Sequence, residues 1–204
     1  MISKDETEKT RSPRGLRQFV TRRVEKVRRV TKQRHEAVLK KGIYKVFSDE
    51  IIPLSIFCLK IYPNTYTVQP VIGNQGYDAI VRDDKGNIFD HIELTLPHDG
   101  FSAARSARLV VERGYGKIDI YSPGKNLNRM FSFILKACHN KSKKDYSNCS
   151  LVVCLNFSPP FPEHKKEYLN SIKKLLKEIK CISFRARKVY LLVMPFNNVI
   201  NIFG

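Results

Sequence analysis

The sequence lacks any long apolar run, although 42% of its 204 residues are hydrophobic. No stretch approaches the ~18–20 apolar residues that a bilayer-spanning helix needs. The opening stretch, MISKDETEKTRSPRG, has no apolar core of the kind that a secretory signal requires. The five cysteines form no CxxC pair and no zinc spacing, and a scattered, odd-numbered set indicates reduced thiols. We therefore expect a soluble, cytoplasmic protein without a transmembrane segment.

Acidic residues are also scarce, because the chain has 19 Asp and Glu against 37 Lys and Arg. A formal net charge of +18 favours a polyanionic partner, since each neutralised phosphate releases counterions. Residues 11–45 have 13 basic residues against two acids, and residues 164–188 have nine against two. Residues 46–112 reverse the balance, with five basic and nine acidic residues. A metal-dependent nuclease needs such basic flanks to hold phosphates and an acidic centre to hold divalent cations.

The apolar residues change their spacing along the chain. Helical spacing predicts one long basic helix over 14–41, ended by Gly42, and a more buried helix within 43–61. Alternating residues then predict three strands, at 65–72, 77–82 and 88–96, joined by tight turns. Further helices are expected over 101–113, 126–139 and 163–181, and buried strands over 150–157 and 189–194.

This order of elements predicts an α/β fold with a mixed central sheet. An antiparallel meander of three strands is followed by buried strands that need crossover connections, so helices should cover both faces. We expect residues 1–13 to form a disordered tail and residues 14–204 to form a single domain that begins with the basic helix.

Three polar side chains share one face of the predicted strand 88–96. Apolar residues alternate with His91, Glu93 and Thr95, and alternate residues of a strand point the same way. Such groups are costly when buried without partners, so we expect them to line a cleft. Asp78 begins the neighbouring strand, and a hairpin would bring it near Glu93. Two carboxylates that meet at a strand end are the smallest ligand set for Mg²⁺.

An Asp followed about fifteen residues later by Glu-x-Lys, at the end of a central hairpin strand, is the motif of the PD-(D/E)XK nuclease superfamily. The chain resembles this superfamily, with Gly76-Tyr77-Asp78 in place of the PD element and Glu93-Leu94-Thr95 in place of (D/E)XK. By element order the resemblance covers residues 30–195. It implies a restriction-endonuclease-like αβββαβ core, with Mg²⁺ or Mn²⁺ held by Asp78, Glu93 and the Leu94 carbonyl.

The chain departs from that family at Thr95, where the family has a lysine that orients the attacking water and stabilises charge. Threonine can hydrogen-bond a water but has no positive charge. Some relatives supply the lysine from a nearby element, and four lysines are candidates for that here: Lys117, Lys141, Lys143 and Lys144. The family often adds a glutamate from the first helix, for which Glu36 and Glu50 are candidates.

Other polar residues each have two interpretations. His91 either contacts substrate beside the metal or is a packed, satisfied histidine. Arg105 and Arg108 share a helix face and either clamp a phosphate or simply face solvent. The lysines at 141, 143 and 144 either contact a nucleic-acid backbone or form a polar loop. Asp99 is interpreted as a helix N-cap.

The leading hypothesis is a Mg²⁺-dependent endonuclease, a hydrolase in which Asp78 and Glu93 hold the metal. Thr95 or a displaced lysine would orient the attacking water, with Glu36 and His91 completing the site. The expected partner is nucleic acid, DNA rather than RNA. Two alternatives stay open: a non-catalytic nucleic-acid-binding protein and a protein-interaction domain on the same fold. The oligomeric state is also open, with a dimer among the options.

Overall fold

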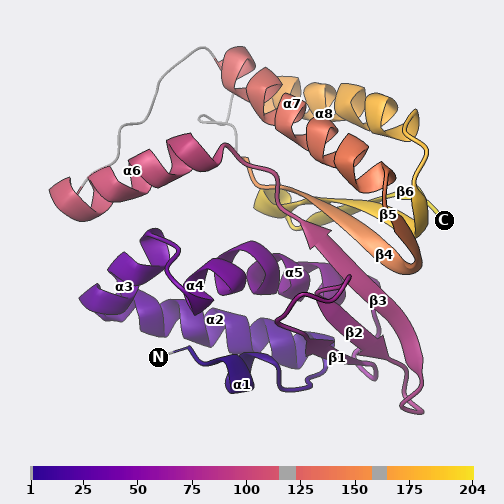
Figure 1. The fold of residues 1–204 in the computed structure, drawn as a ribbon, viewed down its shortest axis with the longest axis horizontal. Coiled ribbons are helices and arrows are strands. Elements are labelled where there is room, and N and C mark those ends of the chain that lie inside the picture. Colours follow the sequence, from indigo (N-terminus) through magenta and orange to yellow (C-terminus); the bar gives the residue numbers. More distant parts are fainter. Residues whose placement is uncertain (1, 115–122, 158–164) are drawn as a thin grey trace.

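A computed structural model describes residues 2–114, 123–157 and 165–204. The chain forms an α/β fold built on one six-stranded mixed open sheet, with strands in the order β1-β2-β3-β4-β5-β6 (Figure 1). This confirms the predicted α/β class and mixed sheet. Within the described ranges, no helix is both long and apolar enough to cross a bilayer.

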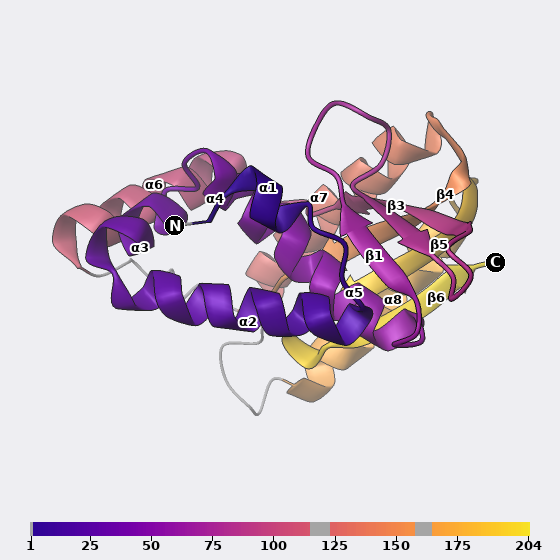
Figure 2. The same cartoon turned by 90° about the horizontal axis from the view of Figure 1, so that it is seen from below.

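The basic N-terminal helix is two helices rather than one. Helix α2 (Pro13–Arg29) begins behind an N-cap in which Ser12 accepts a hydrogen bond from the Gly15 N–H. It ends at Val30, whose φ of −111° and ψ of 108° are extended, and α3 (Thr31–Val38) starts at once. The break turns α3 away from the line of α2 (Figure 2). The two helices have different packing partners, because α2 packs mainly with α5 (Ile52–Ile61) whereas α3 packs with α4 (Ile43–Val46) and α6 (Gly100–Arg113).

The segment before α2 is ordered, in contrast to the expected disordered tail. Helix α1 (Lys4–Thr7) is short, and Ile2 ahead of it is only 3% exposed. Arg11 and Val68 exchange two main-chain hydrogen bonds, with N–O distances of 3.0 and 2.7 Å. The segment therefore covers the free edge of β1, which would otherwise present unpaired main-chain groups. A polar composition did not show this, because the docking uses main-chain groups.

The predicted helix within 43–61 forms as three consecutive helical segments. They are α4 (Ile43–Val46), a π-helical turn η1 (Phe47–Ile51) and α5 (Ile52–Ile61). Pro53 lies in the first turn of α5 and has no N–H to donate to the carbonyl of Asp49, so α-helical pairing fails there. The widened turn carries Asp49 and Glu50.

The three-strand meander is confirmed, and the sheet changes direction at its third strand. Strands β1 (Thr67–Pro70), β2 (Ala79–Arg82) and β3 (Ile88–Thr95) are antiparallel. Strands β4 (Asp145–Leu155) and β5 (Arg185–Val193) continue parallel to β3. An antiparallel strand that the sequence had not indicated, β6 (Asn198–Phe203), closes the far edge.

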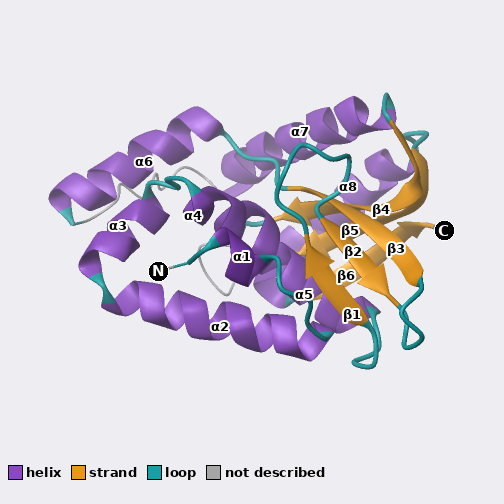
Figure 3. Ribbon diagram, turned by 60° about the horizontal axis from the view of Figure 1, so that its bottom comes forward, coloured by secondary structure: helices purple, strands orange, loops and turns teal. Residues whose placement is uncertain are grey.

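Helices cover both faces of the sheet and form two cores (Figures 1 and 3). On one face, α2 and α5 pack with Ile92 and Leu94 of β3. On the other face, α7 (Pro123–Ser142) and α8 (Lys165–Lys180) pack with Leu151 and Val153 of β4. Helix α6 (Gly100–Arg113) has no buried residue and lies beside α3, away from the sheet.

Candidate active site

Asp78 directly precedes the first residue of β2 and continues the pairing of that strand with β3. Its N–H donates to the Ile92 carbonyl (2.7 Å), and its Oδ2 accepts a hydrogen bond from the Leu94 N–H (2.7 Å). The pairing of Ala79 with Ile92 sets Asp78 opposite Glu93. The N–H and C=O of a strand residue point to the same neighbour, so the Leu94 carbonyl faces the Asp78 side as well. The hairpin thus brings Asp78, Glu93 and Leu94 together.

The turn between β2 and β3 fixes this register. Asp83 Oδ1 accepts hydrogen bonds from the N–H groups of Lys85 (3.0 Å) and Asn87 (2.8 Å), and Gly86 has a φ of +86°. Glycine adopts this left-handed conformation without strain. Asp83 is therefore a turn residue. Gln75 serves the preceding turn in the same way, because its Nε2 donates to the carbonyls of Val71 and Tyr77.

The Glu93 carboxylate forms an ion pair with Lys141, which lies far from it in the sequence. The Nζ of Lys141, in the last turn of α7, lies 2.5 Å from Glu93 Oε1 and 3.3 Å from the Tyr146 hydroxyl oxygen. The Lys141 and Glu93 side chains are 19% and 13% exposed. Burial opposes the charge of Lys141, but the hydrogen bond and attraction to Glu93 outweigh it and raise the lysine pKa. Lys141 is therefore held as a cation beside the acids.

Glu50 joins the same group from the opposite face of the sheet. Burial is the main cause that raises the pKa of Glu50 to about 7, and the carboxylates of Asp78, Asp49 and Glu93 add to it. Burial also raises the pKa of Asp78 to about 6. The hydrogen bond from Leu94 and the charge of Lys141 lower this pKa, whereas the charge of Glu93 raises it further. The three carboxylates Glu50, Asp78 and Glu93, together with Lys141, are called the acid centre below.

Of the two glutamates proposed to complete the site, the structure brings in Glu50 and not Glu36. Glu36 lies on α3 close to Tyr44, where burial first and the Glu36 charge second raise the tyrosine pKa. Glu36 must therefore be replaced by Glu50 in the candidate site. The sequence alone could not choose between the two glutamates. The helix break at Val30 directs α3, and Glu36 with it, away from the ends of the strands.

His91 and Thr95 lie on the same strand face as Glu93, as predicted, and both are half-buried. The His91 ring packs against Tyr77, with centroids 4.5 Å apart, which matches a packed histidine. Thr95 is the last residue of β3 and pairs in register with Val153 of β4.

The predicted phosphate-binding residues lie on two surfaces. Arg105 and Arg108 are exposed on α6 and line a pocket of about 310 Å³ with Phe101 and Glu112. Lys143 and Lys144 are exposed directly after α7, whereas Lys141 is turned inward to Glu93. Lys117, a further candidate for the displaced lysine, lies outside the described residues.

Two other acids have structural roles. Asp99 is the N-cap of α6, where its Oδ1 accepts hydrogen bonds from the N–H groups of Phe101 and Ser102. Asp90, which the sequence did not single out, is only 4% exposed on the core face of β3. Its Oδ2 accepts hydrogen bonds from the hydroxyls of Tyr62 (2.8 Å) and Ser150 (2.6 Å), and Arg187 lies 3.6 Å from Oδ1. The alternation of β3 already placed this charge inside.

The donor chemistry of the acid centre fits a hard divalent cation. Carboxylate and carbonyl oxygens are the ligands that Mg²⁺ prefers, and Asp78, Glu93 and the Leu94 carbonyl supply them. Only Asp78 Oδ2 and Glu93 Oε1 are used in the hydrogen bonds above, so each carboxylate has a second oxygen. Within 2–114, 123–157 and 165–204, however, no three acidic, histidine or cysteine side chains are arranged as a ready ligand cluster. The Leu94 carbonyl would therefore have to complete a ligand set built on Asp78 and Glu93.

Acidic groups held close together in a partly buried place are unusual, because each raises the cost of ionising its neighbours. Their clustering with one cation marks the end of β2 and β3 as the candidate active site. Comparison of the chain with family models, with curated proteins and with solved structures found no match.

Proposed function

We propose that this protein is a metal-dependent nuclease of the PD-(D/E)XK type. The observation that carries the proposal is the meeting of Asp78, Glu93 and Lys141 at the open end of one hairpin, with the charge of Glu50 interacting with both acids. The order of elements also supports it. A helix precedes an antiparallel meander, which is followed by helices and a parallel strand, as in the restriction-endonuclease-like core.

Each group of the acid centre has a role in this proposal. Asp78, Glu93 and the Leu94 carbonyl would hold the cation, and Glu50 would add a fourth oxygen. The bound cation would supply Lewis-acid polarisation of a phosphodiester oxygen. Lys141 takes the place of the lysine missing at Thr95: its Nζ donates a hydrogen bond to the attacking water and its charge stabilises negative charge on the phosphorus oxygens.

The basic surfaces would hold the nucleic acid. Arg105 and Arg108 on α6 and the exposed Lys143 and Lys144 provide cations that can neutralise backbone phosphates. These contacts do not read sequence, so the proposed substrate class is a phosphodiester backbone, with DNA favoured over RNA.

A nuclease assay with Mg²⁺ and with Mn²⁺, on single-stranded and double-stranded DNA and on RNA, tests the proposal. Asp78→Asn and Glu93→Gln should each abolish cleavage while salt-dependent binding persists. Asp84→Asn is the matched control, because Asp84 is an exposed carboxylate in the same hairpin. Cleavage that survives both of the first two substitutions contradicts the assignment of the site.

Thr95 favours a second candidate function, a nucleic-acid-binding protein without catalysis. In that case Lys141 only neutralises the charge of Glu93, and their ion pair takes the place of a bound metal ion. Salt-dependent binding of DNA, together with no cleavage in either metal, would support this function over the first.

A further inference from the structure

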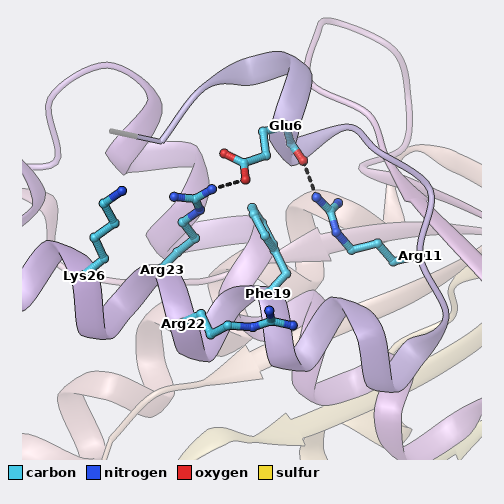
Figure 4. Close-up of a pocket in the computed structure, with 6 residues that line it drawn as sticks. All are labelled: Glu6, Arg11, Phe19, Arg22, Arg23 and Lys26. Carbon is cyan, nitrogen blue, oxygen red and sulfur yellow. Dashed lines mark hydrogen bonds and ion pairs between the residues drawn. The ribbon is translucent and has the colours of Figure 1, made fainter.

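A basic pocket lies between α1 and α2, apart from the acid centre (Figure 4). Its volume is about 390 Å³, in the range of small-molecule sites. Figure 4 shows Phe19 between Arg23 and Arg11, with Glu6 above it, Arg22 below it and Lys26 farther along α2. The lining residues are Glu6, Arg11, Phe19, Arg22, Arg23 and Lys26.

Two of the arginines are fixed in place before any ligand binds. The guanidinium of Arg11 lies 4.0 Å from the centre of the Phe19 ring and donates to the main-chain carbonyls of Glu6 (2.5 Å) and Lys9 (2.6 Å). Arg23 lies 5.6 Å from the same ring and forms an ion pair with Glu6. Cation–π contacts and ion pairs restrain these side chains, so they lose little freedom when an anion arrives.

Arg22 and Lys26 leave the pocket with an excess of positive charge. They are exposed, four residues apart on α2, and therefore on one face of the helix. With a single carboxylate for four cations, the pocket has a formal charge of +3. Glu6 shows where an oxyanion can sit, because its carboxylate is already held by Arg23.

Phe19 restricts the chemistry of the ligand. Its ring is only 8% exposed and its faces are used by the guanidinium groups, so a nucleobase has no free surface on which to stack. The recognition must therefore come from charge and from hydrogen-bond donors. A phosphate monoester, with a charge of about −1.5 to −2 and three acceptor oxygens, matches an arginine cluster of this kind.

We infer that this pocket binds a phosphate monoester through Arg22, Arg23 and Lys26. The phosphate group belongs either to a free nucleotide, for which inorganic phosphate is the simplest stand-in, or to the end of a nucleic-acid strand. Assigning it to a strand end rests on the proposed function, whereas phosphate binding in the pocket does not.

Fluorescence anisotropy in EDTA, where metal-dependent cleavage cannot proceed, tests this inference on the full chain. Two oligonucleotides of one sequence are compared, one with a 5′-phosphate and one with a 5′-hydroxyl, and inorganic phosphate is the competitor. The 5′-phosphorylated strand should bind about tenfold more tightly, which corresponds to about 1.4 kcal/mol. If inorganic phosphate competes but the two strands bind equally, the pocket binds free phosphates. That result contradicts only the assignment of the phosphate to a strand end.

The variant R22A/K26A should remove both the preference and the competition. The matched control R29A/K32A removes the same charge from exposed positions just beyond the pocket and should keep them. Glu6→Gln should tighten phosphate binding severalfold, because it removes the carboxylate that competes with the anion while the amide oxygen of glutamine can still accept a hydrogen bond from Arg23. Equal effects of the two double variants, or no phosphate binding by the wild type, would overturn the inference. Loss of cleavage in Asp78→Asn with the phosphate preference intact would separate this pocket from the acid centre.

Discussion

The ammonium group of Lys141 lies 2.5 Å from the Glu93 carboxylate, although 48 positions separate the two residues in the chain. The family motif would place this cation two residues after Glu93, where the sequence has Thr95. The end of α7 places a cation beside Glu93, and substitutions at Lys141 test whether this ion pair serves the proposed catalysis.

Lys141→Ala should lower the cleavage rate about 100- to 1000-fold, because removing one preorganised donor from a charge-stabilising site typically costs that much. Lys144→Ala, an exposed neighbour, should change the rate severalfold at most and act mainly through salt-dependent binding. Steady-state kinetics should place the first effect in kcat and the second in KM. Equal losses in the two variants would assign Lys141 to phosphate binding alone.

Thr95→Lys should restore part of the rate lost in Lys141→Ala. Thr95 lies on the same face of β3 as Glu93, so a lysine there reaches the acid centre from the strand. We expect the double variant to recover at least about tenfold of the lost rate. Thr95→Arg in the same background is the control, since its planar guanidinium is not interchangeable with an ammonium group. A double variant no faster than Lys141→Ala would contradict the exchange of roles.

Glu50→Gln should stabilise the metal-free protein at high pH. Burial raises the pKa of Glu50 from 4.5 to about 7, so its favourable contribution is complete below pH 4.5 and is lost as the pH rises through about 7. In EDTA above pH 7 the Tm of the variant should exceed that of wild type by a few degrees, and the gain should vanish below pH 4.5. Glu25→Gln, an exposed change on α2, should leave Tm unchanged at both extremes. A gain that does not depend on pH would point to a different cause.

Divalent cations should raise the thermal stability through the acid centre. A ligand that binds only the folded state stabilises it by RT ln(1 + [L]/Kd), so excess Mn²⁺ or Mg²⁺ should increase Tm. The shift should disappear in Asp78→Asn and persist in Asp84→Asn. This measurement needs no substrate, so it detects ligation even if the protein does not cleave. No shift in the wild type would remove the metal from the proposal.

Asp90→Ala should destabilise the protein by about 3 kcal/mol, because it leaves buried hydroxyls of Tyr62 and Ser150 without their acceptor. Asp84→Ala, on the exposed hairpin turn, should change the free energy of unfolding by less than about 0.5 kcal/mol. Urea unfolding measures both. Similar values for the two would show that the buried network is not a significant source of stability.

Local patterns predicted most of the fold, and distant contacts accounted for the differences. Alternation identified β2 and β3, and their hairpin was expected to bring Asp78 near Glu93, as the observed pairing does. The register itself came only from the structure, which shows the Asp83–Gly86 turn. The break at Val30 was missed because the apolar spacing continues across it. The N-terminal segment was missed because its docking on β1 uses main-chain groups, which side-chain composition does not reveal.

The candidate site was only half predictable for a similar reason. Asp78 and Glu93 belong to one hairpin, so a short stretch of sequence specifies them. Glu50 and Lys141 reach the same place through tertiary packing of helices on opposite faces of the sheet, which no local spacing encodes. Glu36 and Glu50 were equivalent candidates until the direction of α3 was known.

Glu50 lies in the π-helical turn η1, which contains one residue more than an α-helical turn. The direction of its side chain around the helix axis depends on that extra residue. Pro53 follows the turn and has no N–H for the Asp49 carbonyl, so one α-helical hydrogen bond cannot form beside it. Substituting that proline with alanine would let the helix tighten and rotate Glu50 out of alignment with Asp78. A residue with no atom in the acid centre would then influence how close the Glu50 carboxylate lies to the other two.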